Sequence, residues 1–153
     1  MSYNLLKGKR GIIFGALNSA SIAWKVAERA VAEGAEIVLT NTPISLRMGE
    51  LNDLAERLNA PVIAADATSV EDLENLIDKA MEHFGGKIDF VLHSVGMQPN
   101  VSKNIPYPEL NYTFLDKTLD ISAISFHKVM QVLYNKQAMN EWGSIVALTY
   151  LAA

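Results

Sequence analysis

The sequence of 153 residues contains no cysteine. It can therefore form neither a disulfide nor a thiolate site for zinc or an iron–sulfur cluster, which fits a reducing cytosol. Long apolar runs are missing too, because none approaches the roughly 20 residues that a helix needs to cross a bilayer. The opening segment MSYNLLKGKR also lacks the apolar core of a signal peptide. These absences predict a soluble cytoplasmic protein without a membrane contact.

Clustered positive charge is absent as well. The chain has 13 Lys and Arg against 17 Asp and Glu, a formal net charge of −4, and the basic residues are scattered. Nucleic acid binding requires a basic patch or stripe, so this class of partner is excluded. No cluster of His, Asp and Glu has the spacing of metal ligands, and we therefore predict no metal site.

What the sequence does contain is enough apolar material for one core, since 50% of its residues are hydrophobic. No repeat, low-complexity tract or change in composition marks a second domain. We expect a single domain over residues 1–153. Its last expected strand lies close to Ala153, where a fold of this type normally continues, so we expect the domain to be incomplete at its C-terminus.

Near-continuous apolar runs alternate with helical patterns along the chain. Such runs mark strands that are covered on both faces, as in parallel sheets. With right-handed crossovers they predict an α/β fold, a doubly wound parallel sheet of the Rossmann type, with strand order 3-2-1-4-5 and truncated after the fifth strand. The expected strands are Gly11–Phe14, Glu36–Leu39, Pro61–Ala65, Ile88–Leu92 and Ser144–Thr149.

Apolar residues at helical spacing predict the connecting helices. A first helix follows Ser21 and ends at Gly34, and a third is started by a capping box of Thr68 and Glu71 and stopped by Gly85. The segment Met97–Asp116 shows little periodicity and is expected to be irregular. The remaining expected helices cover Leu51–Leu58 and about Lys117 to Met139.

The most informative segment is the turn Gly15–Ala23, between the first strand and the first helix. Backbone N–H groups gather there at the positive end of a helix, which attracts a phosphate. Gly15 permits a tight turn and the close approach of a pyrophosphate, and Ser21 can cap the helix and donate its hydroxyl to the same anion. The turn lacks the usual G-x-G-x-x-G pattern, so a plain strand-to-helix connection is the alternative.

The spacing Gly15-x5-Ser21-Ile22-Ala23 resembles the cofactor turn of the enoyl-acyl-carrier-protein reductases, a divergent branch of the short-chain dehydrogenases/reductases. Further similar blocks follow in family order over essentially the whole chain. The resemblance implies that Gly15, Ser21 and Ile22 hold the pyrophosphate of NADH or NADPH. The further blocks are Asp66-Ala67, His93–Gly96, Asp120–Ser122 and Leu148–Leu151.

The same resemblance assigns Asp66 and Ala67 to the adenine ring. A carboxylate at a strand end can accept a hydrogen bond from the exocyclic amine of adenine, although a turn aspartate that bonds the backbone two residues on is the alternative. After the fourth strand, the block at Ser94, Val95 and Gly96 would border the nicotinamide ribose, at the strand end where open α/β sheets bind ligands.

Met97 and Gln98 follow this block, and by the resemblance they border the acyl substrate. His93 precedes it and is interpreted as a core histidine rather than a general base, because it lies in a buried strand.

The choice between NADH and NADPH is weakly encoded. Sites specific for NAD usually place an acid about 20 residues beyond the glycine turn, whereas the second strand here ends in Thr40-Asn41-Thr42-Pro43. Arg47 could attract a 2′-phosphate. Relatives that use NADH also lack the acid and have a polar residue that matches Thr42 near the adenosine ribose. We therefore expect NADH, with NADPH as the alternative.

Tyr150 is the one candidate catalytic residue, because it follows an apolar strand at the active-site end of the sheet. The alternative is an ordinary tyrosine at a strand end. The resemblance places the matching aromatic residue beside the acyl substrate. The resemblance places the family's carbonyl-polarising tyrosine and ribose-binding lysine later than Ala153, so we expect that this chain alone is not a competent reductase.

The function that the resemblance implies is NAD(P)H-dependent reduction of trans-2-enoyl thioesters on acyl carrier protein, in fatty acid biosynthesis, by an enzyme that forms a homotetramer. This chain would supply the cofactor-binding part. Two alternatives are a non-catalytic dinucleotide-binding module and another short-chain reductase acting on a ketone. The exposed apolar segment Ser144–Ala153 further predicts a poorly soluble or unstable isolated chain.

Overall fold

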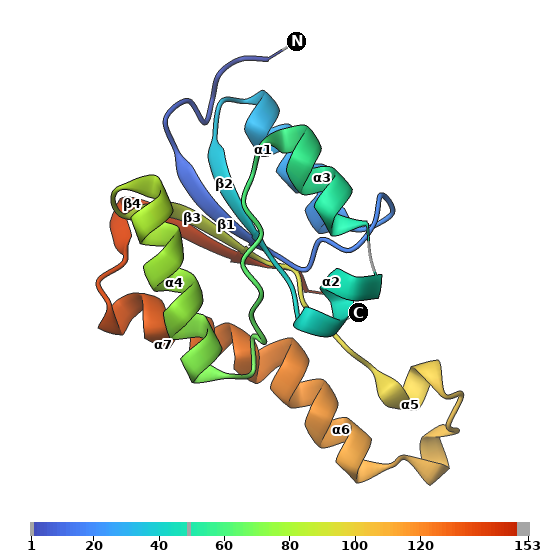
Figure 1. Cartoon of the computed structure of the whole chain (residues 1–153). Coiled ribbons are helices and arrows are strands. Elements are labelled where there is room, and N and C mark those ends of the chain that lie inside the picture. Colours follow the sequence, from blue (N-terminus) through green and yellow to red (C-terminus); the bar gives the residue numbers. More distant parts are fainter. Residues whose placement is uncertain (1, 49, 150–153) are drawn as a thin grey trace.

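A parallel sheet forms the centre of the structure, a computed structural model that describes residues 2–48 and 50–149. Over these residues the sheet has four strands in the order β2-β1-β3-β4, and each neighbouring pair is parallel (Figure 1). The predicted doubly wound α/β fold is therefore confirmed. The strands are β1 (Arg10–Phe14), β2 (Glu36–Thr40), β3 (Ile88–His93) and β4 (Met139–Ala147).

The segment Pro61–Ala65 does not form the predicted strand. It runs beside β2 in the expected place, but only an isolated parallel bridge between Leu39 and Val62 joins the two. Backbone hydrogen bonds link Leu39 N to Pro61 O and Ile63 N to Leu39 O at 2.9 and 3.0 Å. Pro61 has no N–H to extend the ladder. The predicted strand order otherwise holds, with this segment beside the outer strand.

Helices connect the strands, and the predicted long helix has different bounds. It begins at Tyr112 rather than Lys117 and ends at Asn135, because β4 already starts at Met139. A π-helical turn over Asp120–Ile124 divides it. The helices are α1 (Ile22–Ala32), α2 (Pro43–Met48), α3 (Leu51–Leu58), α4 (Val70–Phe84), α5 (Pro99–Ser102), α6 (Tyr112–Leu119) and α7 (Ser125–Asn135).

The segment Met97–Asp116 is more regular than predicted. It contains α5, a short 3₁₀ helix at Tyr107–Glu109 and the start of α6. Within the described ranges, no helix is both long and apolar enough to cross a membrane.

The caps of α4 correct one further prediction. Ser69, not Thr68, occupies the N-cap, and its side chain accepts a hydrogen bond from Asp72 N at 3.2 Å. At the other end Gly85 adopts the left-handed conformation with φ of 63°, as its predicted role as a helix stop requires.

Helices lie on both faces of the sheet (Figure 1), and an apolar layer forms beneath them on each face. Helices α4 and α7 pack on one face, where Leu76 and Leu133 are fully buried. Helices α1 and α3 pack on the other face, through residues such as Trp24 and Leu54. The carboxyl ends of the parallel strands thereby point to one edge of this sheet.

Strand β4 lies at the edge of the sheet, as expected for the last strand. Its Ile145 packs against the layer of α4 and α7. Val146 points to the opposite face, which α1 and α3 do not extend to cover, and its side chain is 51% exposed. The predicted exposed apolar edge is therefore present as far as residue 149.

Candidate functional site

A cavity of about 650 Å³ opens at the carboxyl ends of β1, β2 and β3. The chain leaves β1 toward β2 on one side and returns to β3 on the other, and such a switch point is where open α/β sheets bind ligands. The cavity is lined by Phe14, Gly15, Thr40, Asn41, Thr42, Pro43, Ile44, Ser45, Ala65, Asp66, Ala67, Thr68, Val95, Gly96, Met97, Lys117, Asp120 and Ile121.

The sequence predictions and this lining agree in part. Gly15, Thr42, Asp66, Ala67, Val95, Gly96 and Met97 line the cavity, whereas Ser21, Ile22, Ser94 and Gln98 are not among its lining residues. The predicted catalytic residue Tyr150 lies outside the described residues. A second hollow of about 750 Å³ between α7 and β4 has no carboxylate in its lining and contains none of the predicted site residues.

Gly15 occupies the sharpest point of the turn after β1. Its φ is +88°, and a Cβ at this position would lie 1.9 Å from the carbonyl oxygen of Ser94. Its N–H donates to Thr40 O at 3.1 Å. The turn is therefore pressed against the segments after β2 and β3, and a side chain cannot fit there.

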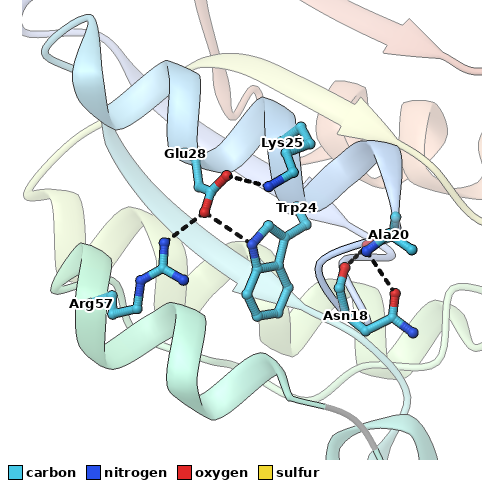
Figure 2. Close-up of polar contacts among 7 residues, drawn as sticks. Asn18, Ala20, Trp24, Lys25, Glu28 and Arg57 are labelled. Carbon is cyan, nitrogen blue, oxygen red and sulfur yellow. Dashed lines mark hydrogen bonds and ion pairs between the residues drawn. The ribbon is translucent and has the colours of Figure 1, made fainter.

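Ser21 corrects a prediction about this turn. It holds the N-cap position of α1, but its side chain makes no capping hydrogen bond. Its hydroxyl instead donates to Asn18 O at 2.7 Å and accepts from Leu17 N at 3.2 Å. The Asn18 side chain in turn accepts from Ala20 N at 3.1 Å (Figure 2). The turn is thus fixed by its own side chains, while the N–H groups that open α1 keep no side-chain cap.

Helix α1 is held in place by Glu28, which accepts three hydrogen bonds (Figure 2). Lys25 Nζ donates to it at 3.0 Å, Arg57 Nη2 at 2.6 Å and Trp24 Nε1 at 3.1 Å. The lysine and arginine hydrogen bonds lower the pKa of Glu28 to about 2. Because Arg57 belongs to α3, this cluster joins the two helices behind the turn.

Asn41 joins three walls of the cavity. Its side-chain Nδ2 donates to Ala16 O at 3.0 Å, and its Oδ1 accepts from Thr42 N at 2.9 Å. Its carbonyl accepts from Ala65 N at 3.1 Å. One residue at the end of β2 therefore fixes the positions of the glycine turn, the Thr42 wall and the segment that leads to Asp66.

Asp66 bonds the backbone two residues on, which is the turn that the sequence analysis gave as the alternative to an adenine contact. Its Oδ1 accepts from Thr68 N at 2.8 Å and from Thr68 Oγ1 at 2.7 Å. Ala67 between them is 5% exposed. Asp66 is nevertheless one of the residues that line the cavity, and its predicted contact with adenine stays a prediction.

The wall after β3 is tied to the π-helical turn. Ser122 Oγ accepts from Met97 N at 3.1 Å and donates to Met97 O at 3.3 Å. A Cβ on Gly96 would lie 3.6 Å from the same hydroxyl. The backbone at Gly96 and Met97 is therefore held against the π-helical turn, and both residues line the cavity.

His93 is a core histidine, as predicted. Its side chain is 2% exposed and lies near the rings of Phe14 and Phe126. Its Nε2 is 2.8 Å from Ser125 Oγ, and Ser125 Oγ donates to Ile121 O at 2.6 Å. With the serine proton committed to Ile121, His93 Nε2 is the donor. Burial lowers the pKa of His93.

The lowered pKa of His93 predicts a pH dependence of stability. In the unfolded chain this imidazole binds a proton near pH 6.5, whereas the folded protein binds it only at lower pH. The contribution of neutral His93 to the free energy of unfolding is therefore fully present above about pH 6.5. It is lost as the pH falls below this value, by at most about 1.4 kcal/mol per pH unit. Urea unfolding at pH 7.5 and 5.5 measures this loss.

The control for this prediction is His93→Gln, which keeps a hydrogen-bonding side chain without a titratable ring. We expect a smaller change in its unfolding free energy between the two pH values. An equal change in both proteins would contradict the assignment to His93.

Several lining residues were missed as site residues in the sequence. Thr40 ends β2 and Asn41 follows it, so their position at a strand end was the signal that could have identified them. Lys117 approaches from α6, and Asp120 and Ile121 approach from the π-helical turn. The block Asp120–Ser122 contributes to the family resemblance but was given no role in the site. Across the described parts of the chain, no group of three or more His, Asp or Glu is placed to hold a metal ion.

Comparisons with known proteins place this geometry in context. The family model described as enoyl-(acyl carrier protein) reductase matches residues 15–153. Enoyl-[acyl-carrier-protein] reductase [NADH] 1 of Rhizobium meliloti (strain 1021) is 36% identical over 151 residues, which are 97% of this chain and 54% of the relative. The enzyme of Mycolicibacterium smegmatis is 33% identical over 95% of this chain and 54% of its own length.

Solved structures agree. The FabI–NADH complex from Alistipes finegoldii is 72% identical, with a TM-score of 0.95, and the match covers 97% of this chain and 52% of that one. An enoyl-[acyl-carrier-protein] reductase (NADH) from Aquifex aeolicus is 28% identical, with a TM-score of 0.82, over 95% of this chain and 57% of that one. The chain thus spans about half the length of the relatives it matches.

Proposed function

The chain belongs to the enoyl-(acyl carrier protein) reductase family, and from this premise we propose that it forms the NADH-binding part of an enzyme that reduces trans-2-enoyl thioesters on acyl carrier protein. The observation that carries the proposal is the cavity at the strand ends, in a fold that matches a FabI–NADH complex with a TM-score of 0.95. The substrate is inferred from relatives that are about twice as long as this chain.

The residues of the cavity fit a dinucleotide. The glycine turn is a cradle that any Cβ would fill, and the start of α1 presents N–H groups without a side-chain cap. The fully buried Thr40 hydroxyl beside it has no hydrogen-bond partner among the described residues. These features support a bound diphosphate at the turn and a nucleoside on each side of it.

Each wall has a proposed role. Gly15 and the first turn of α1 would hold the diphosphate, with Ser21 and Ile22 at its border. Thr42 would lie near the adenosine ribose, and Asp66 with Ala67 near the adenine. Ser94, Val95 and Gly96 would border the nicotinamide ribose, and Met97 and Gln98 the acyl substrate. When bound, NADH supplies the hydride.

The thioester oxygen gains negative charge as the enoyl group is reduced, so a hydrogen-bond donor must be placed beside it. Tyr150 stays the predicted aromatic residue at the substrate, although its structure lies outside the described residues. The chain's own contribution is thus to bind and orient the cofactor against the wall at Met97. A homotetramer stays a prediction from the resemblance.

The proposal is tested by titrating the chain with NADH and following nicotinamide fluorescence. We expect saturable binding, tighter for NADH than for NADPH. Asp66→Ala should weaken NADH binding by about tenfold, because a hydrogen bond to a carboxylate is lost. Asp78→Ala is the matched control, since Asp78 lies on α4 outside the cavity lining and pairs with Lys136.

The absence of saturable NADH binding would refute the proposed cofactor site. NADH oxidation with crotonyl thioester, compared with oxidation by a ketone, then separates the reductase from the alternatives. A protein that binds NADH but oxidises it with the ketone alone would be a different short-chain reductase.

A further inference from the structure

Lys128 on α7 bridges two walls of the cavity without belonging to its lining. Its Nζ donates to the carbonyl oxygen of Thr68 at 2.9 Å and to Asp120 Oδ1 at 2.9 Å. Its side chain is 25% exposed. Thr68 and Asp120 both line the cavity, from the segment before α4 and from the π-helical turn respectively. One ammonium group therefore connects two walls that are 52 residues apart in sequence.

The first wall depends on the position of Thr68. Its N–H and its hydroxyl both bind Asp66 Oδ1, at 2.8 and 2.7 Å. Thr68 therefore orients the Asp66 carboxylate on one side and accepts from Lys128 on the other. A change that releases the Thr68 carbonyl would let the Asp66 turn move relative to the sheet.

The second wall carries a charge that needs a partner. The side chain of Asp120 is 42% exposed, and its ion pair is with Lys128. Asp66 and Asp120 are the acidic residues of the lining, against the single lysine Lys117. An unpaired Asp120 carboxylate would repel the phosphates of a dinucleotide, and the adjacent ammonium offsets this repulsion.

We propose that Lys128 is a positioning residue for the adenosine half of the cofactor. It fixes the Asp66–Thr68 turn to the π-helical turn and neutralises Asp120, and it acts through these groups rather than through a contact of its own. The inference rests on the proposed function, because it requires that NADH occupies the cavity.

The test compares Lys128 within α7 with Lys136 at the C-terminal cap of the same helix. Lys128→Met keeps the apolar stem and removes the donor. Lys136→Met is the matched control, because Lys136 is the C-cap residue of α7, pairs with Asp78 at 2.8 Å, is 24% exposed and does not line the cavity. We expect K128M to bind NADH about tenfold more weakly than the parent chain and K136M to bind it within twofold.

Two fragments of the cofactor locate the effect. Adenosine monophosphate should lose about as much affinity for K128M as NADH does, whereas nicotinamide mononucleotide should bind within twofold of the parent. A loss that is equal for both fragments, or equal for K128M and K136M, would overturn the inference. A parent chain that binds no NADH would instead refute the proposed function.

A double variant separates neutralisation from positioning. In K128M/D120N the unpaired carboxylate is gone, so we expect the loss of NADH affinity to shrink from about tenfold to about threefold. An equal loss in the single and double variants would show that Lys128 does not act by neutralising Asp120.

If K128M does not fold, the inference can be tested on the chain without substitutions, by measuring how fast its lysines are acetylated. Lysines are acetylated with and without NADH and quantified by mass spectrometry. We expect NADH to slow acetylation of Lys128 severalfold, because the bound cofactor holds both walls against it, while Lys136 reacts at the same rate. Labelling of Lys128 that NADH leaves unchanged would overturn the inference.

Discussion

Gly15→Ala is expected to lower the affinity for NADH by more than about 100-fold. A Cβ would lie 1.9 Å from the Ser94 carbonyl oxygen, and the residue has φ of +88°. The left-handed conformation costs an alanine about 1–2 kcal/mol, and the clash with backbone must be relieved by moving the turn away from β3. Because the turn forms the proposed diphosphate site, this movement removes the N–H groups from their positions. Fluorescence titration with NADH measures the loss.

Gly8→Ala separates conformational strain from the loss of the cradle. Gly8 has φ of +75°, but no atom lies within 4 Å of the place where its Cβ would be. We expect the same strain of about 1–2 kcal/mol in urea unfolding, with NADH affinity within twofold of the parent. If G8A and G15A lost affinity to the same degree, the effect would be one of stability, and the role given to Gly15 would be wrong.

Leu133→Ala is expected to lower the free energy of unfolding by about 2–5 kcal/mol. Leu133 is 1% exposed and belongs to the apolar layer between α7, α4 and the sheet. Its truncation removes buried apolar atoms and leaves a cavity where the helix meets β3 and β4. Domains of this size are stable by only about 5–15 kcal/mol, so the loss is a large fraction of the total. Urea unfolding followed by circular dichroism measures it.

Tyr134→Ala is the neighbouring control. Tyr134 is 82% exposed on the same helix, and we expect its substitution to change stability by no more than about 0.5 kcal/mol. Similar losses for the two variants would mean that α7 does not pack as described.

The sheet can be predicted from the sequence because strands that are buried on both faces consist mainly of apolar residues. Strands such as Ile88–His93 consist of nearly continuous apolar residues, and Gly34 and Gly85 stop helices where the backbone turns left-handed. The segment Pro61–Ala65 carries the same apolar mark, yet it makes only one bridge. Val62 and Ile63 are partly buried against the core, and an extended segment can place apolar residues in this way without forming a strand.

A site residue can be predicted from the sequence where the backbone conformation at that position permits only one residue type. Gly15 is such a residue, since its turn excludes every side chain. The hydroxyl of Ser21 is not, because a serine at an N-cap can bond either the helix or the preceding turn, and here it bonds the turn. Lys128 and Asp120 could not be found in this way, because their pairing with the carbonyl of Thr68 depends on how α7 packs beside α4.

The π-helical turn at Asp120–Ile124 sets the phase between α6 and α7. Each residue of an α-helix advances the direction of its side chain by about 100°, and a π turn holds one extra residue. If all five residues of this segment wound instead as a continuous α-helix, the extra residue would rotate α7 by about 100° relative to α6. Lys128 and Ser125 would then leave the sheet-facing side while α6 kept its own. The π winding of this segment, which absorbs the extra residue, therefore keeps Lys128 and Ser125 on the side of α7 from which they reach the cavity wall and the sheet.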